Sequence, residues 1–248
     1  ARITPLNHRD VLNILRENVN RFEYQKTLYN VIYHKISEFS VGSMNFETWL
    51  RNTSVEDTET LYYGIYASTF PNEGAFMYTC PMCGAEREYT VNHGNLIKTT
   101  DSEHMRKHIK EVSNGAVNQD TMKQFSLIGK NKAIKLPKSN IIFDLRTPTL
   151  YDLLEILRTI PEETINQDTE SIVYMLYANK ILIPTGTGYF EEYKKTKILN
   201  VIDELPIDDA VEFKDAVDNR VDNNRITYSL KHIKCYECQH EVKEIPLS

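Results

Sequence analysis

The chain has 248 residues, of which 41% are hydrophobic, and its formal net charge is −6. This length and composition suit one large domain or two modest ones with a real core, and they exclude a wholly disordered protein. The negative charge argues against a surface devoted to nucleic acid, because phosphate binding requires a positive field. The 15 tyrosines favour a protein with several contact surfaces.

The apolar segments are all short. No run approaches the roughly 18 consecutive apolar residues that cross a bilayer, and residues 1–9 lack the apolar core of a secretion signal. We therefore expect a soluble protein inside the cell. All four cysteines fall into two Cys-x-x-Cys pairs, which in a reducing compartment favours a metal over a disulfide framework.

The first 75 residues are predicted to form an N-terminal helical region. Apolar residues recur at helical spacing over residues 7–39, which indicates one or two helices. A short helix is expected over residues 46–50. Thr53 and Glu56 then have the spacing of a capping box, which predicts a further helix to about Ser68.

Two segments share one plan of strand, cysteine pair and strand. Residues 76–79 and 86–91 flank the first pair, residues 226–234 and 241–245 flank the second, and each set predicts a β-hairpin. Gly84 supplies permissive backbone at the first tip. We predict that residues 76–92 and 226–248 together form a split zinc ribbon.

Residues 93–225 are predicted to be a mainly helical insertion within that ribbon, apart from a possible strand at 141–145. Thr147 is the expected N-cap of a helix that has Pro148 at its first position. Pro184 and the Thr-Gly-Thr-Gly run at 185–188 predict a loop, followed by a helix over 191–203. The predicted fold class is thus α+β and mainly helical.

The two cysteine pairs predict one structural Zn²⁺ ion, held by Cys80, Cys83, Cys235 and Cys238. Four thiolates fill the zinc tetrahedron and leave no position for water, so the ion would not be catalytic. The alternatives are a redox-active pair, surface thiols or two separate disulfides. His93 and His240 are near enough in sequence to replace a ligand, although we interpret both as surface histidines.

Two other motifs are weaker. His104 and His108 lie four residues apart in an expected helix, but residue 105 is Met where a zinc protease has Glu, which favours a solvated helix face. The run at 185–188 lacks the Gly-Lys-Ser/Thr ending of a phosphate-binding loop, so a plain connector is favoured.

Charged and aromatic clusters are interpreted mainly as surface features. Five lysines form a basic run that could contact phosphates or an acidic partner, although a solvated loop is favoured: Lys123, Lys130, Lys132, Lys135 and Lys138. Five carboxylates gather near an expected helix start, where they complement the helix dipole: Asp203, Glu204, Asp208, Asp209 and Glu212. Three tyrosines, Tyr62, Tyr63 and Tyr66, suit core packing on one helix face and an interface on the other.

The order of these parts resembles the baseplate-hub protein family of T-even-type contractile-tailed bacteriophages. The matching parts are residues 46–50, the segment 53–64, the Cys-Pro-Met-Cys-Gly hairpin at 80–84, a helical middle and the closing ribbon over 235–245. The resemblance implies a virion component of the tail or baseplate, assembled in the host cytoplasm and in contact with other phage tail or baseplate proteins. Only the four cysteines carry over as functional residues.

Three functions follow as hypotheses. The first is a structural viral protein, a zinc-stapled component of a phage tail baseplate or hub that acts through protein–protein contacts during tail assembly and is not an enzyme. The alternative is a zinc-ribbon protein associated with nucleic acid, which steep salt-dependent binding would reveal. The third, an enzyme with unrecognised residues, would require clustered acid, base or nucleophilic groups in a deep pocket.

Overall fold

The computed structural model describes residues 2–16, 20–38, 43–71, 74–90, 97–99, 103–114, 126, 128–163, 169–222 and 227–247. Within these residues the fold is α+β, and all strand pairs are antiparallel. No helix in the described part of the chain combines the length and apolar character needed to cross a membrane.

The N-terminal part is a helical unit with one short strand pair. Its elements are β1 (Arg2–Ile3), α1 (His8–Arg16), α2 (Arg21–Lys35), β2 (Ile36–Glu38), α3 (Phe46–Asn52) and α4 (Asp57–Thr69). The helices α2, α3 and α4 enclose a cluster that includes Tyr29, Ile32 and Trp49, and α7 adds Leu150 and Leu154 to it. Aromatic packing orients this cluster, since the Tyr29 and Trp49 rings meet edge to face with centroids 6.4 Å apart.

A second core forms around a four-stranded sheet in the middle of the chain. The strands are β6 (Lys132–Lys135), β7 (Ile142–Leu145), β8 (Ala178–Thr185) and β9 (Gly188–Glu192), in that order. Helices α7 (Leu150–Thr159), α9 (Thr169–Tyr177), α10 (Lys195–Asp203) and α11 (Ile207–Asp222) contribute to its core. Phe143 of β7 packs on Phe213 of α11, with ring centroids 4.4 Å apart.

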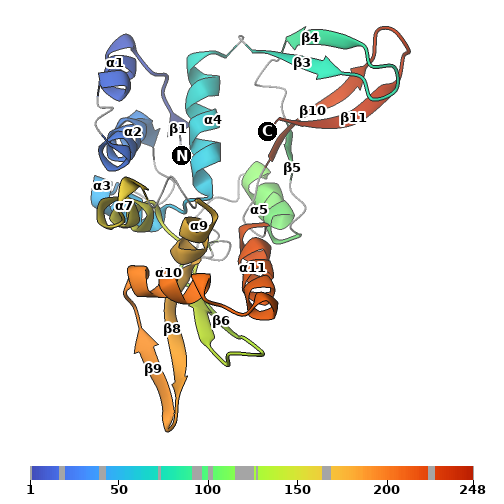
Figure 1. Ribbon diagram of the computed structural model, residues 1–248. Helices are drawn as coiled ribbons and strands as arrows, with labels where there is room; N and C mark the ends of the chain where they lie inside the picture. The colour runs from blue at the N-terminus through green and yellow to red at the C-terminus, as the bar shows by residue number, and fades with distance from the viewer. Residues whose placement is uncertain are drawn as a thin grey trace.

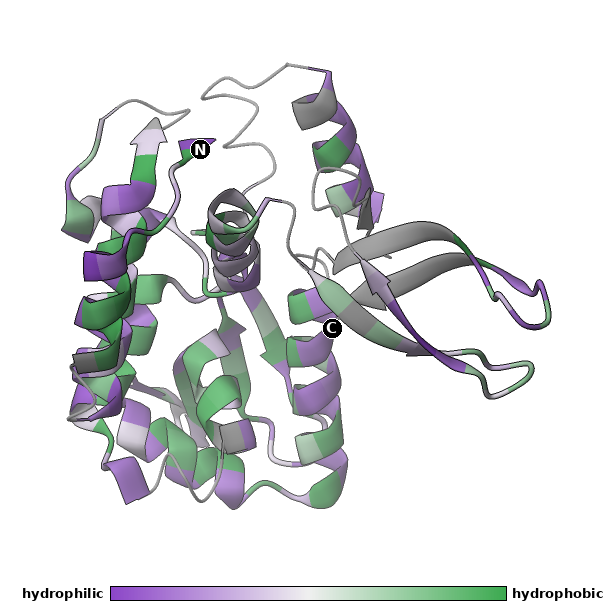
Figure 2. Ribbon diagram, turned by 90° about the horizontal axis from the view of Figure 1, so that it is seen from above, coloured by the Kyte–Doolittle hydropathy of each residue, from purple (hydrophilic) through white to green (hydrophobic). Residues whose placement is uncertain are grey.

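The cysteine-bearing hairpins project from the rest of the molecule, as Figures 1 and 2 show from two directions. Strands β3 (Ala75–Thr79) and β4 (Glu86–Thr90) form one hairpin, and β10 (Thr227–Lys234) and β11 (Glu241–Leu247) form the other. Strand β5 (Ile97–Thr99) pairs with β10, and α5 (Glu103–Ser113) follows it. Both predicted hairpins are confirmed.

The segment predicted as a mainly helical insertion contains five helices in its described parts, and it also contains the four-stranded sheet, of which the sequence indicated only the strand near residues 141–145. The run at 185–188 is the tight turn of the β8–β9 hairpin and not a loop between helices. Strand β8 shows no alternation of buried and exposed residues, since Ala178 and Ile181, its buried positions, lie three residues apart, a spacing that does not indicate a strand. The helix predicted to begin at residue 191 begins at Lys195.

Two helix starts also differ from the sequence predictions. The N-cap of α7 is Thr149, two residues after Thr147; its hydroxyl accepts the Asp152 backbone N–H, and Asp152 accepts the Thr149 N–H in return. Thr53 closes α3 instead of capping α4. Its backbone carbonyl accepts the N–H of Leu150, so this segment pairs with the start of α7.

Candidate metal centre

Each cysteine pair lies in a tight turn at a hairpin tip, and the two turns have the same backbone hydrogen bonds. In the first, Cys80 N–H donates to Ala85 O at 2.9 Å, and Gly84 N–H donates to Cys80 O at 2.9 Å. In the second, Cys235 N–H donates to His240 O at 2.8 Å, and the N–H of residue 239 donates to Cys235 O at 3.0 Å. The equivalent bonds place the two cysteines of each pair in equivalent positions.

The fourth residue after the first cysteine has a left-handed backbone in both turns. Gly84 has φ of 72° and Gln239 has φ of 58°. Glycine adopts this conformation without steric cost, whereas a glutamine there is strained. The Gln239 amide donates to Tyr236 O at 3.1 Å, a contact within the same turn. A positive φ therefore belongs to the turn itself and not only to the glycine predicted from sequence.

The two tips bring all four cysteine sulfur atoms within 4.8 Å of one another. Cys80 Sγ lies 3.7 Å from Cys238 Sγ, and Cys83 Sγ lies 3.6 Å from Cys235 Sγ. These two contacts each join one hairpin to the other. A tetrahedral zinc ion with Zn–S bonds of about 2.3 Å has sulfur–sulfur edges of roughly 3.8 Å, so the spacing fits a single ion.

Two further contacts hold the hairpins against each other. The Tyr89 hydroxyl on β4 donates to Lys234 O at 3.1 Å. The Arg87 guanidinium lies over the Tyr236 ring, 4.6 Å from its centroid, in a cation–π contact. Sequence analysis missed these residues, and no local pattern identifies them, because each contact joins segments that lie far apart in the chain.

The thiols of the cluster differ in burial and in pKa. Cys80 and Cys235 are 2% and 5% exposed, whereas Cys83 and Cys238 are exposed. Hydrogen bonding from the Cys238 backbone N–H lowers the pKa of Cys235 to about 7. The Ala85 backbone N–H lowers the pKa of Cys83, but hydrogen bonds with its thiol neighbours, Cys238 foremost, and burial outweigh it and raise that pKa to about 12.

This arrangement suits a closed metal site. Four sulfur ligands select soft or borderline ions such as Zn²⁺ and leave no open coordination position. Metal binding would take all four thiols to thiolates, because the ion's charge dominates the local electrostatics. The geometry can therefore support a structural role and offers no position for a substrate.

The other predicted metal residues do not join this cluster. Among the described residues, no second group of three or more histidine, cysteine or acidic side chains is close enough to hold an ion. His240 contributes its backbone carbonyl to the second turn but no ring nitrogen to the sulfur cluster. His93 and the His104 side chain lie outside the described parts, and His108 lies in α5.

Some residues of the basic run contact residues of the acidic cluster. Asp209, which is fully buried in α11, accepts the backbone N–H groups of Lys138 and Ser139 at 2.9 and 2.7 Å. The Lys138 ammonium lies 3.5 Å from an Asp208 oxygen. Lys123 lies outside the described residues. The structural role predicted for these carboxylates thus includes fixing the turn between β6 and β7.

Comparison with known proteins identifies the family. No curated protein and no solved structure matches the chain. The sequence model of the T4 bacteriophage base plate protein family matches residues 25–248, which include both cysteine pairs and both apolar cores. The chain therefore belongs to the T4 bacteriophage base plate protein family.

Proposed function

We propose that this protein is a zinc-stapled component of the phage tail baseplate or hub, which acts through protein–protein contacts during tail assembly. Membership of the family makes it a structural protein of the phage baseplate, with phage tail proteins as its partners. We further propose that the protein binds zinc, acts in tail assembly, does not catalyse a reaction and is assembled into the tail in the host cytoplasm.

The observation that carries the proposal is the cluster of four sulfur atoms within 4.8 Å. A Cys₄ set favours zinc among the common structural ions, because the soft thiolates match it and the site is closed. The ligands come from segments 152 and 158 residues apart. One ion would therefore close a very long loop, and such closure removes much freedom from the unfolded chain.

The proposed ion would complete a split ribbon made of residues 76–92 and 226–248. In this organisation residues 1–75 form a helical region, and residues 93–225 are inserted between the halves of the ribbon. Helix α7 contributes to the apolar clusters of both the N-terminal helices and the central sheet, so those two parts share a boundary. The division into these units remains a prediction.

Exposed apolar side chains on the hairpin tips support a role in protein contacts. Met77, Met82 and Tyr236 are 63%, 69% and 70% exposed, and all three lie on the projecting hairpins. Methionine and tyrosine are enriched at protein interfaces. We infer that the ion holds these side chains in one rigid surface.

The alternative, a zinc-ribbon protein that binds nucleic acid, has less support. One lysine of the basic run, Lys138, forms an ion pair with Asp208 of α11, and the chain carries a net charge of −6. Such a protein would bind DNA or RNA with an affinity that falls steeply with salt. A filter-binding series over salt concentration separates the two functions.

The experiment that tests the proposal combines genetics with a particle inventory. Phage carrying Cys235→Ser is compared with phage carrying Glu237→Gln, which changes an exposed residue between the two cysteines and removes no ligand. Mass spectrometry of purified particles should find the protein with tail components in the control, and the serine variant should lose it from particles or block tail formation. Normal particles with a full complement of the serine variant would contradict the role of the metal.

A further inference from the structure

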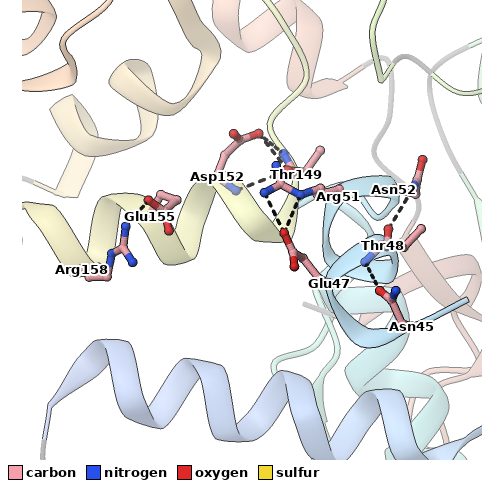
Figure 3. Close-up of polar contacts among 9 residues, drawn as sticks. All are labelled: Asn45, Glu47, Thr48, Arg51, Asn52, Thr149, Asp152, Glu155 and Arg158. Atoms are coloured by element: carbon pink, nitrogen blue, oxygen red, sulfur yellow. Dashed lines mark hydrogen bonds and ion pairs between the residues drawn. The ribbon is translucent and has the colours of Figure 1, made fainter.

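A second site lies far from the cysteines, where α3, the end of β7 and the start of α7 meet. A pocket of about 260 Å³ opens there, and its lining includes Arg51, Arg146 and Thr147. Figure 3 shows Arg51 on α3 beside Thr149 and Asp152 at the start of α7. Two cationic side chains from different elements thus converge on one small pocket.

Arg51 presents a fixed and partly exposed guanidinium. Its Nε and Nη2 atoms donate to one Glu47 oxygen at 3.2 and 2.9 Å, and the group stacks on the Tyr151 ring with its carbon 3.5 Å from the centroid. The side chain is 49% exposed. Because the ion pair uses one edge of the guanidinium, the remaining N–H groups are left for another acceptor.

Arg146 is positioned by Asp152 but keeps one donor unused. Its Nη2 atom donates to Asp152 Oδ1 at 2.6 Å. The other Asp152 oxygen accepts the backbone N–H and the hydroxyl of Thr149 at 2.9 and 2.8 Å, so both oxygens of this carboxylate already accept hydrogen bonds. The Arg146 Nε atom is buried and has no hydrogen-bond partner among the described residues.

Thr147 provides a second unused group. The residue is 2% exposed, and its hydroxyl has no partner in the described part of the chain. A buried polar group without a partner destabilises the folded state, and proteins rarely retain one without a reason. Arg146 and Thr147, which both line the pocket, therefore each have a polar group without a hydrogen-bond partner among the described residues.

The unused donors of the pocket, and not an excess of positive charge, favour an anion. Its charged lining residues are Arg51, Arg146 and Asp152, and each arginine already pairs with one carboxylate, Arg51 with Glu47 and Arg146 with Asp152. The amides of Asn131 and Asn179 also line it, and their N–H groups both donate to Asp144, which is not a lining residue.

We propose that this pocket binds one carboxylate, supplied by an acidic side chain of a neighbouring protein in the tail. Arg51, Arg146 and Thr147 would donate to it, a set of charge-assisted hydrogen bonds of the strong class. The volume lies below the roughly 300–1,000 Å³ typical of small-molecule sites, which suits a single side chain. The identity of the partner as a tail protein rests on the proposed function, whereas carboxylate binding does not.

The test uses the full chain and N-acetyl-glutamic acid amide as the probe, with N-acetyl-glutamine amide as its uncharged match. Binding is followed by the NMR signals of the arginine Nε–H groups at constant ionic strength. We expect the acidic probe to shift the Arg146 signal saturably and the glutamine probe to leave it unchanged. No shift, or equal shifts with both probes, would overturn the proposal.

Three variants sharpen this test. Arg51→Gln and Thr147→Val should each weaken binding about tenfold, the effect expected for one hydrogen bond to a charged group. Arg158→Gln is the matched control, because Arg158 also lies on the surface in an ion pair but points away from the pocket residues (Figure 3). It should leave binding unchanged.

Thr147→Val also separates this site from a purely structural one. The valine variant should unfold at the same temperature as the wild type or a higher one, because the lost hydroxyl has no partner. A lower unfolding temperature, or unchanged binding, would contradict the assignment. The cysteines take no part in the pocket, so binding of the probe should persist even if zinc or tail localisation is disproved.

Discussion

The central sheet region and the cysteine hairpins are stabilised in opposite ways. Around the sheet, large apolar side chains such as Phe143, Met175 and Phe213 are almost completely buried. In the hairpins, the buried side chains among those described are Cys80, Cys235 and Ile233. Apolar burial therefore suffices for the first region, whereas the second depends on the link between its two halves.

This difference follows from the size of each unit. A two-stranded hairpin such as β3–β4 is marginally stable in water by itself, and the exposed side chains at its tip add little burial. The proposed metal ion would supply the missing stability and would also fix the two hairpins relative to each other. The comparison teaches that the body of the chain is held by a hydrophobic core, whereas its projecting hairpins bury little apolar surface and bring four cysteines together, as a metal-held unit would.

The largest expected effect is that of metal removal. Structural zinc in small domains is worth about 10–16 kcal/mol of apparent binding free energy, so a chelator should release the hairpins from each other. Hydrogen exchange followed by mass spectrometry should show faster exchange in β3, β4, β10 and β11 and little change in β7 and β8. Equal loss of protection in both regions would break the comparison.

Phe143→Ala should destabilise the central sheet region and not the cysteine hairpins. Truncating this fully buried ring leaves a cavity in the sheet core and should lower the free energy of unfolding by about 3–5 kcal/mol. Chemical denaturation measures this loss. Phe190→Ala on β9 is the control, because that ring is 54% exposed and its removal should cost less than about 0.5 kcal/mol.

Asp209→Asn should destabilise the same core in a pH-dependent way. Burial raises the pKa of Asp209, but the backbone N–H groups of Lys138 and Ser139 outweigh it and leave the pKa below its ordinary value of 3.8. The carboxylate therefore contributes stability above about pH 4, which is lost as the pH falls towards the lowered pKa.

The asparagine variant should lose stability at neutral pH, because its one carbonyl oxygen replaces only one of the two acceptors and its NH2 group faces the other backbone donor. Its difference from the wild type should shrink as the pH falls from about 4 towards the lowered pKa, at which the wild-type carboxyl becomes protonated. Thermal melts between neutral and acidic pH provide the comparison. A constant difference across this range would show that the charge of Asp209 has no part in holding the turn.

The smallest expected effect is at the start of α7. Thr149→Ala removes the capping hydroxyl and should cost about 1 kcal/mol of unfolding free energy, with Thr48→Ala on the exposed face of α3 as the control. Urea denaturation of both variants tests this. A loss no larger than that of the control would indicate that packing alone sets the start of α7.

The sequence was most informative where the type of residue and its spacing both indicate the same structure. The cysteine pairs identify both hairpins, because residues such as Gly84 and the flanking alternation mark a turn between strands. The central sheet could not be predicted in the same way, since the buried positions of β8, Ala178 and Ile181, lie three residues apart and do not show the alternation that marks a strand. The contacts of Tyr89 and Arg87 across the hairpins depend on tertiary structure and leave no local signal.

The carboxylate pocket was also invisible in the sequence. Arg51 and Arg146 are separated by a long stretch of chain, and neither lies in a recognisable motif. They meet only because the segment after α3 pairs with the start of α7, through the bond from Leu150 N–H to Thr53 O. The helix cap lies at Thr149 and not at Thr147, which leaves the Thr147 hydroxyl without a capping role.

The central claim is that one zinc ion links the two cysteine hairpins, and native mass spectrometry of the purified full chain tests it most directly. The account predicts one zinc ion per chain, lost in Cys80→Ser and in Cys235→Ser and retained in Glu237→Gln. A chain that carries no zinc after expression with the metal supplied, or one that keeps the same zinc content in both serine variants, would contradict it.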